Sequence, residues 1–91
     1  MKIRVRYFAS IRESLGKSED EIEIKDGLKL SNFIEYLSKI DKVSNILFNN
    51  KRLKDGIIVS YNATTVNRNE FDKIILKDGD EIAFLPFIAG G

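Results

Sequence analysis

One stretch of the chain has the apolar spacing of an amphipathic helix, and it constrains what the other segments can fold into. Its apolar residues recur at helical intervals with polar residues between them: Leu30, Phe33, Ile34, Leu37 and Ile40. A helix with one apolar face must bury that face against another layer. The remaining apolar residues are grouped in short runs typical of strands, so the second layer is predicted to be a sheet.

The segments before this helix have the pattern of two strands. Residues 2–8 alternate basic and apolar side chains, and residues 21–24 alternate acidic and apolar ones, as expected of half-buried strands. Residues 10–16 between them are predicted to form a single helical turn that Ser10 caps and Gly16 ends. The two strands are expected to pair as a hairpin.

After the helix the chain returns to extended segments. Residues 46–48 are interpreted as one further helical turn and residues 49–56 as a polar loop. Strands are predicted at residues 57–61, 64–66 and 81–85. The last strand is apolar on both faces, which indicates a central position in the sheet.

This order of elements is typical of the β-grasp, or ubiquitin-like, fold. It is an α+β fold with a mixed sheet and one main helix packed on one face. We expect residues 1–85 to form this domain and residues 86–91 to form a flexible tail that ends in Gly-Gly. A four-stranded RNA-recognition sheet is the main alternative, but it needs two long helices and the sequence offers one.

The composition excludes several kinds of chemistry. The 91 residues contain no Cys and no His, which removes disulfides, thiolate metal sites and imidazole bases. A net charge of +1 is too balanced to predict nucleic-acid binding. The apolar runs fall far short of the ~20 residues that span a bilayer, and the first residues lack the apolar core of a signal peptide. We expect a cytoplasmic protein without nucleic-acid or membrane partners.

The last six residues, 86–91, are the strongest functional signal. Extended, they reach about 20 Å beyond the last strand at ~3.3–3.6 Å per residue, and two glycines without side chains can enter a narrow channel in another protein. Glycine also leaves a terminal carboxylate unhindered, so a partner enzyme can adenylate it and sulfide, persulfide or an amine can then attack. A frayed end without function is the alternative interpretation.

The last strand also predicts a docking surface. Ile82 and Phe84 lie on one face of this strand and the residues between and after them on the other, so one apolar pair must face away from the helix. Phe87 and Ile88 would extend that apolar patch, and such a patch beside a functional tail indicates a partner site. Closure of the core from its edge is the alternative interpretation.

Three charged clusters have simpler explanations. The basic row Lys2, Arg4 and Arg6 could steer an acidic partner if the first and last strands are neighbours, but a solvated face is the favoured interpretation. Asp78 and Asp80 resemble a catalytic pair of carboxylates. A Lys-Asp-Gly-Asp turn needs both side chains for backbone hydrogen bonds, and this is the favoured interpretation. The cluster at residues 51–54 is interpreted as a solvated loop.

Over nearly its whole length the chain resembles the MoaD-type sulfur carriers, the small subunits of molybdopterin synthase, within the MoaD/ThiS/ubiquitin-like family. The resemblance rests on residues 5–16, on residues 59–62 and, most specifically, on residues 76–86 with the tail that follows. Two positions depart from the family pattern. Phe87 stands where a second proline is frequent, and Ala63 stands where a glycine usually follows the asparagine.

The resemblance implies a role for the tail. Gly91 would be the catalytic position: it is adenylated, thiocarboxylated, and donates sulfur to cyclic pyranopterin monophosphate in molybdenum cofactor biosynthesis. The chain would bind no cofactor and no metal, because ATP and the sulfur donor are used by an adenylating activator of the MoeB, ubiquitin-activating-like type. Catalytic side chains would lie in the large, MoaE-type subunit, which makes this chain a non-catalytic sulfurtransferase subunit. Partner contacts are expected from Phe84, Pro86, Phe87, Ile88, Ala89 and Gly90.

Three other functions stay open at this point. A ubiquitin-like modifier would be joined through Gly91 to lysines of other proteins, and it differs only in what attacks the activated glycine. A sulfur carrier for tRNA thiolation or thiamine synthesis would use the same terminal chemistry. A plain interaction module would use none of it.

Overall fold

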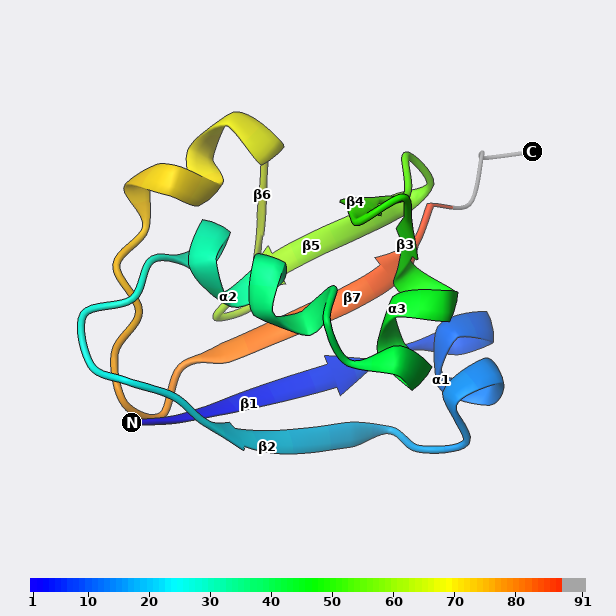
Figure 1. Ribbon diagram of the computed structural model, residues 1–91, viewed down its shortest axis with the longest axis horizontal. Coiled ribbons are helices and arrows are strands. Elements are labelled where there is room, and N and C mark those ends of the chain that lie inside the picture. Colours follow the sequence, from blue (N-terminus) through cyan, green and yellow to red (C-terminus); the bar gives the residue numbers. More distant parts are fainter. Residues whose placement is uncertain (88–91) are drawn as a thin grey trace.

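Alternation of basic and apolar residues builds the first strand, β1 (Lys2–Tyr7), and the apolar half of the pattern is buried. The computed structural model describes residues 1–87, and Figure 1 shows helices lying across one face of a sheet. Five strands form this sheet in the order β2-β1-β7-β5-β6. The other four are β2 (Glu19–Glu23), β5 (Ile57–Tyr61), β6 (Thr64–Val66) and β7 (Glu81–Pro86).

Strand β7 occupies the centre of the sheet, as its apolar residues predict. It runs parallel to β1 and antiparallel to β5, so it has a hydrogen-bonded neighbour on each side. Strand β2 pairs antiparallel with β1 and forms the predicted hairpin. The mixed sheet and the β-grasp fold are confirmed.

Helix α2 (Leu30–Leu37) carries the predicted apolar stripe and covers the sheet. The stripe is buried in one core with the inward side chains of β1 and β7. Its most deeply buried members have no exposed surface: Leu30, Phe33 and Leu37. None of the helices within residues 1–87 has the length and apolar content to cross a bilayer.

A hydrogen bond to a side chain marks the start of α2, and another helix follows its end. The backbone N–H of Lys29 donates a hydrogen bond to the side-chain oxygen of Asn32 at 3.0 Å, which places the helix start at Lys29. Ile40, predicted as the last residue of the stripe, instead precedes a second helix, α3 (Asp41–Leu47). Of the single further turn predicted at residues 46–48, Ile46 and Leu47 are the end of this longer helix, whereas Phe48 begins a strand.

Two short segments differ from the prediction. Helix α1 (Ala9–Leu15) begins directly after Phe8, whose backbone is still extended and bonded to β7, so Ser10 lies inside the helix and does not cap it. Gly16 ends α1 in a left-handed conformation, as predicted. Residues 49–56 are not only a loop, because β3 (Phe48–Asn49) pairs with β4 (Arg52–Leu53) in a small second sheet. A 3₁₀ helix, η1 (Arg68–Lys73), precedes β7.

The sheet holds the chain slightly beyond the predicted domain end at residue 85. Pro86 pairs with Ile57 of β5 as the last residue of β7. The backbone N–H of Phe87 then donates a hydrogen bond to the carbonyl oxygen of Gly56 at 2.7 Å. The departure point of the tail is thus fixed by β5 and by the segment that precedes it.

Candidate functional site

The structure describes only the root of the predicted functional tail. Pro86 is half-buried at the end of β7, whereas the side chain of Phe87 is 63% exposed. Ile88, Ala89, Gly90 and Gly91 lie outside the described residues, so their predicted roles stay predictions. Figure 1 shows β7 ending on the side of the molecule opposite the N-terminus.

Phe84 was predicted as a partner contact, but the structure places its side chain in the core. It is fully buried, and its ring stacks on that of Tyr7 with centroids 6.4 Å apart. In this structure it therefore offers no surface to a partner. Its neighbours Ala83 and Leu85 point to the opposite face of β7, the face that the helices leave open.

An apolar patch lies on this open face at the root of the tail. Leu85 pairs with Ile58 of β5, and Phe8 lies beside β7 because its N–H donates to the carbonyl oxygen of Phe84 at 3.2 Å. All three side chains are half-buried, and exposed Phe87 follows Leu85 by strand alternation. We call Phe8, Ile58, Leu85 and Phe87 the open-face patch.

Sequence reasoning found only part of this patch. Phe8 continues the outward side of β1, and the guanidinium carbon of Arg6 lies 5.0 Å from the centre of its ring. The alternation of residues 2–8 predicts this, because Phe8 falls on the same side of the strand as Arg6. Ile58 could not be found in the same way, because its place depends on the register between β5 and β7.

The basic row of β1 is paired with acidic side chains on both sides. Lys2 lies 3.7 Å from Glu21 of β2, and Arg6 lies 3.9 Å from Glu81 of β7. Arg4 lies between the two acidic rows, 3.8 Å from Glu19 and 4.0 Å from Glu81. These exposed pairs are worth little stability. They neutralise the row locally, in accord with a solvated face.

The aspartates of the 77–80 turn are used by the fold. Asp78 accepts a hydrogen bond from the backbone N–H of Lys2 at 2.7 Å. Asp80, 8% exposed, accepts from the hydroxyl of Tyr61 at 2.6 Å, from the Asn62 amide at 3.1 Å and from the Lys77 backbone at 2.8 Å. The two carboxylates therefore lock β1, β5 and β7 together at the end opposite the tail.

The surroundings of Asp80 also set how it titrates. Burial by itself raises the pKa of Asp80, but the hydrogen bonds from Tyr61, Lys77 and Asn62 stabilise the carboxylate more, and the net pKa is lowered. Burial, and then the bond to Asp80, raise the pKa of Tyr61 to about 12. At neutral pH the pair is thus a carboxylate and a neutral phenol. We interpret their hydrogen bond as one that stabilises the fold. No cluster of acidic side chains within residues 1–87 has the makeup of a metal site.

Comparison with known families decides the classification. The model of the ThiS family matches residues 5–91 of the chain. The chain belongs to the ThiS family. The match begins within β1, at Val5, and includes the open-face patch and residues 86–91.

Curated relatives of this ThiS-family protein share its full length. A protein of Chlamydomonas reinhardtii named molybdopterin synthase sulfur carrier subunit is 33% identical over 95 residues, with all of both chains covered. A protein of Mycobacterium tuberculosis with the same name is 27% identical, with 100% of this chain and 99% of the other covered. The resemblance to the molybdopterin synthase small subunits is confirmed.

Solved structures confirm the β-grasp fold of the ThiS-family chain. The small archaeal modifier protein 1 of Methanosarcina acetivorans has a TM-score of 0.75 at 26% identity, with 99% of this chain and 96% of that chain covered. A chain from the complex of subunits 1 and 2 of the molybdopterin-converting factor of Helicobacter pylori has a TM-score of 0.67 at 21% identity, with both chains fully covered. The latter likeness concerns the fold alone.

Proposed function

We propose that this ThiS-family protein is the sulfur carrier subunit of a molybdopterin synthase. One structural observation carries the proposal: the open-face patch, which includes Phe87, surrounds the point where the central strand β7 ends. In the sequence, Gly90-Gly91 follows three residues after Phe87. A buried central strand fixes the base of the tail, and an apolar patch at that base gives a partner a surface to bind. The names of the full-length relatives support the choice of this carrier.

The reacting group would be the carboxylate of Gly91. One of its oxygens attacks the α-phosphorus of ATP, and pyrophosphate leaves. A sulfide-level sulfur then attacks the acyl carbon, AMP leaves, and the product is a thiocarboxylate. The thiocarboxylate sulfur attacks a carbon of cyclic pyranopterin monophosphate, and the carbon–oxygen bond at that carbon breaks as the oxygen leaves. Water then cleaves the acyl–sulfur bond, which leaves the sulfur on the pterin and restores the carboxylate.

The side chains for these steps would belong to two partners. An adenylating activator would bind ATP and receive the sulfur donor, and a large synthase subunit would bind the pterin. This chain would contribute the reacting carboxylate, a slim penultimate Gly90 and the open-face patch. The complex of subunits 1 and 2 in the Helicobacter pylori structure supports a large-subunit partner. A cytoplasmic location is part of this proposal.

Protein modification through Gly91 is the second candidate. The full-length likeness to the Methanosarcina acetivorans modifier protein favours it. The two candidates share the adenylation step and differ in the acceptor: a pterin carbon attacked by the thiocarboxylate, or a lysine amine that attacks the activated glycine. Carriers for tRNA thiolation or thiamine synthesis share the same activation and differ again in the acceptor.

Reconstitution separates these candidates. Thiocarboxylated protein is mixed with the large subunit of the same organism and cyclic pyranopterin monophosphate, and molybdopterin is measured by fluorescence after oxidation. We expect product in proportion to the thiocarboxylate supplied, and none with the carboxylate form. Absence of product, together with covalent ladders on other proteins when activator and ATP are added to cell extract, would replace the sulfur carrier with the modifier.

A further inference from the structure

The β3–β4 hairpin, residues 48–55, lies beside the root of the tail. Asn50 and Lys51 form its turn with φ values of 53° and 65°, the left-handed geometry of a tight two-residue hairpin. The next residues lead to Gly56, whose carbonyl oxygen accepts the 2.7 Å hydrogen bond from Phe87. Figure 1 shows the hairpin close to the end of β7.

Arg68 of η1 fastens the hairpin to the domain. Its guanidinium donates hydrogen bonds to the carbonyl oxygens of Leu53 at 2.7 Å and Ile57 at 3.2 Å, and also to that of Lys54. The rigid fork of donors on arginine suits several acceptors at once. On the inner side, Phe48 and Leu53 belong to the hydrophobic core. The hairpin is therefore a fixed part of the fold.

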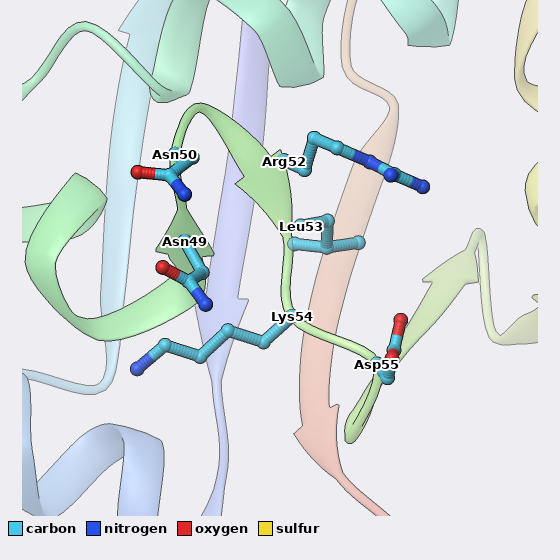
Figure 2. A pocket seen from close by; sticks show the side chains of 6 residues that line it. All are labelled: Asn49, Asn50, Arg52, Leu53, Lys54 and Asp55. Atoms are coloured by element: carbon cyan, nitrogen blue, oxygen red, sulfur yellow. The ribbon is translucent and has the colours of Figure 1, made fainter.

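The outer side of the hairpin is basic. Lys51, Arg52 and Lys54 are all exposed, and together with exposed Asp55, the acidic residue of the segment, they give residues 48–55 a charge of +2. Figure 2 shows the side chains of Arg52, in β4, and of Lys54, directly after it, extending in opposite directions; with Asp55 they help to line a hollow of about 360 Å³. None of the ion pairs found within residues 1–87 includes these three cations. In this they differ from the basic row of β1, which is paired with glutamates.

We infer that this hairpin is a second docking surface, and that its cations meet an acidic surface on the enzyme that adenylates the tail. The inference rests on the proposed function. We choose the adenylating enzyme because sulfur transfer and protein modification both require adenylation first. The partner surface is inferred to be acidic by charge complementarity, because a group of exposed cations attracts a negatively charged surface and speeds association with it.

Its position gives the hairpin a role that the open-face patch cannot supply. The patch lies on the open face of the sheet, whereas Phe48 and Leu53 of the hairpin pack into the core on the helix side. The base of the tail lies between them. A partner that contacts both sides fixes the direction in which the tail enters its channel, and with it the position of the terminal carboxylate.

Charge reversal tests the inference. The hairpin variant is Lys51→Glu with Lys54→Glu, which leaves the side chains of the β3–β4 pair and Arg68 untouched. The matched control is Lys25→Glu with Lys73→Glu, which makes the same change in net charge at exposed positions outside the hairpin, beyond the end of β2 and at the end of η1. Circular dichroism and thermal unfolding verify that both variants are folded.

The readout is ATP–pyrophosphate exchange by the adenylating enzyme of the same organism, with kcat and KM measured at about 50 mM and about 300 mM salt, because salt screens exposed charges. For the hairpin variant we expect KM to rise about tenfold at low salt with kcat within about twofold, and the difference to shrink at high salt. The control should stay within about twofold of wild type.

Three results would overturn the inference. The hairpin variant and the control could have equal KM values, or the rise in KM could be independent of salt. In both cases exchange by the wild-type chain would still support the proposed function. If the wild-type chain itself gave no exchange with an enzyme active on another carrier, the proposed function and this inference would fail together.

Discussion

Phe87 and Gly56 are joined by a 2.7 Å backbone hydrogen bond at the point where the chain leaves the sheet. This bond continues the pairing of β5 with β7 one step beyond Pro86. It places the exposed ring of Phe87 beside the other residues of the open-face patch and fixes the base of the tail. We therefore distinguish residues that hold this base from residues that a partner contacts.

The exposed ring of Phe87 is predicted to act in binding and not in folding. Phe87→Ala should leave the free energy of unfolding almost unchanged, since the ring is 63% exposed. It should weaken binding to the large subunit by about 1–3 kcal/mol, as expected of an aromatic anchor in an interface. Isothermal titration calorimetry measures the loss. Ile75→Ala is the control, because Ile75 is 60% exposed elsewhere on the surface, and an equal loss there would contradict the patch.

The buried ring of Phe84 is predicted to act in folding. Phe84→Ala removes a fully buried side chain that stacks on Tyr7, and it should lower the free energy of unfolding by about 3–5 kcal/mol. Urea unfolding followed by circular dichroism measures this. A loss below that of an ordinary surface substitution would show that the ring is not in the core.

Loss of Arg68 is predicted to loosen the hairpin. Arg68→Lys cannot reproduce bonds to three carbonyl oxygens and should cost about 1 kcal/mol, the net contribution of an ordinary hydrogen bond, because water can reach the exposed acceptors. Hydrogen exchange of the amides of residues 48–57 should speed up more than exchange in β1. Arg12→Lys on the exposed face of α1 is the control. Unchanged protection of the hairpin amides would contradict the fastening role.

Alkaline pH is predicted to destabilise the fold through two tyrosines. Burial, and then the hydrogen bond to Asp20, raise the pKa of Tyr7 well above its usual value, and the pKa of Tyr61 is raised to about 12. A raised folded-state pKa means that the stabilisation is complete below the unfolded value of 10.0 and is lost as pH rises through the folded value. Thermal unfolding should show this decline above pH 10. Tyr61→Phe should make the decline shallower, and an equally steep decline would contradict the assignment.

Acid pH is predicted to act through Asp80. Its folded-state pKa lies below the unfolded value of 3.8, so its stabilisation is present above that value and is lost as pH falls through the lower folded value. Asp80→Asn should lower stability at neutral pH and flatten the acid decline. The comparison uses midpoints of thermal unfolding from neutral to acid pH. Exposed Asp78→Asn is the control, and an equal flattening there would contradict the role of Asp80.

Local patterns predicted the fold well where one face of an element is buried. The stripe from Leu30 to Leu37 and the alternation of β1 each repeat often enough to identify the element. Strands β3 and β4 have two residues each, which is too short for any period to show. The cap of α1 was missed because Phe8 stays bonded to β7, a contact that joins residues far apart in the sequence.

The candidate site was predicted in the same uneven way. The sequence singled out the tail, whose role stays a prediction, and Phe87, which the structure shows to be exposed. The alternation of β7 does not say which pair of side chains faces the helix. The structure places Phe84 inside and Leu85 outside, and it adds Phe8 and Ile58 through strand register. The role of Arg68 had no sequence signal, because its acceptors are backbone carbonyls.

Intact-mass measurement tests the central claim most directly. The purified chain is incubated with ATP, sulfide and its adenylating enzyme, beside a variant that lacks Gly91. The account predicts that one terminal oxygen of the wild-type chain is replaced by sulfur and that the variant keeps its mass. An unchanged wild-type mass, with an activator that modifies another carrier in the same mixture, would contradict the account and leave an interaction module without terminal chemistry.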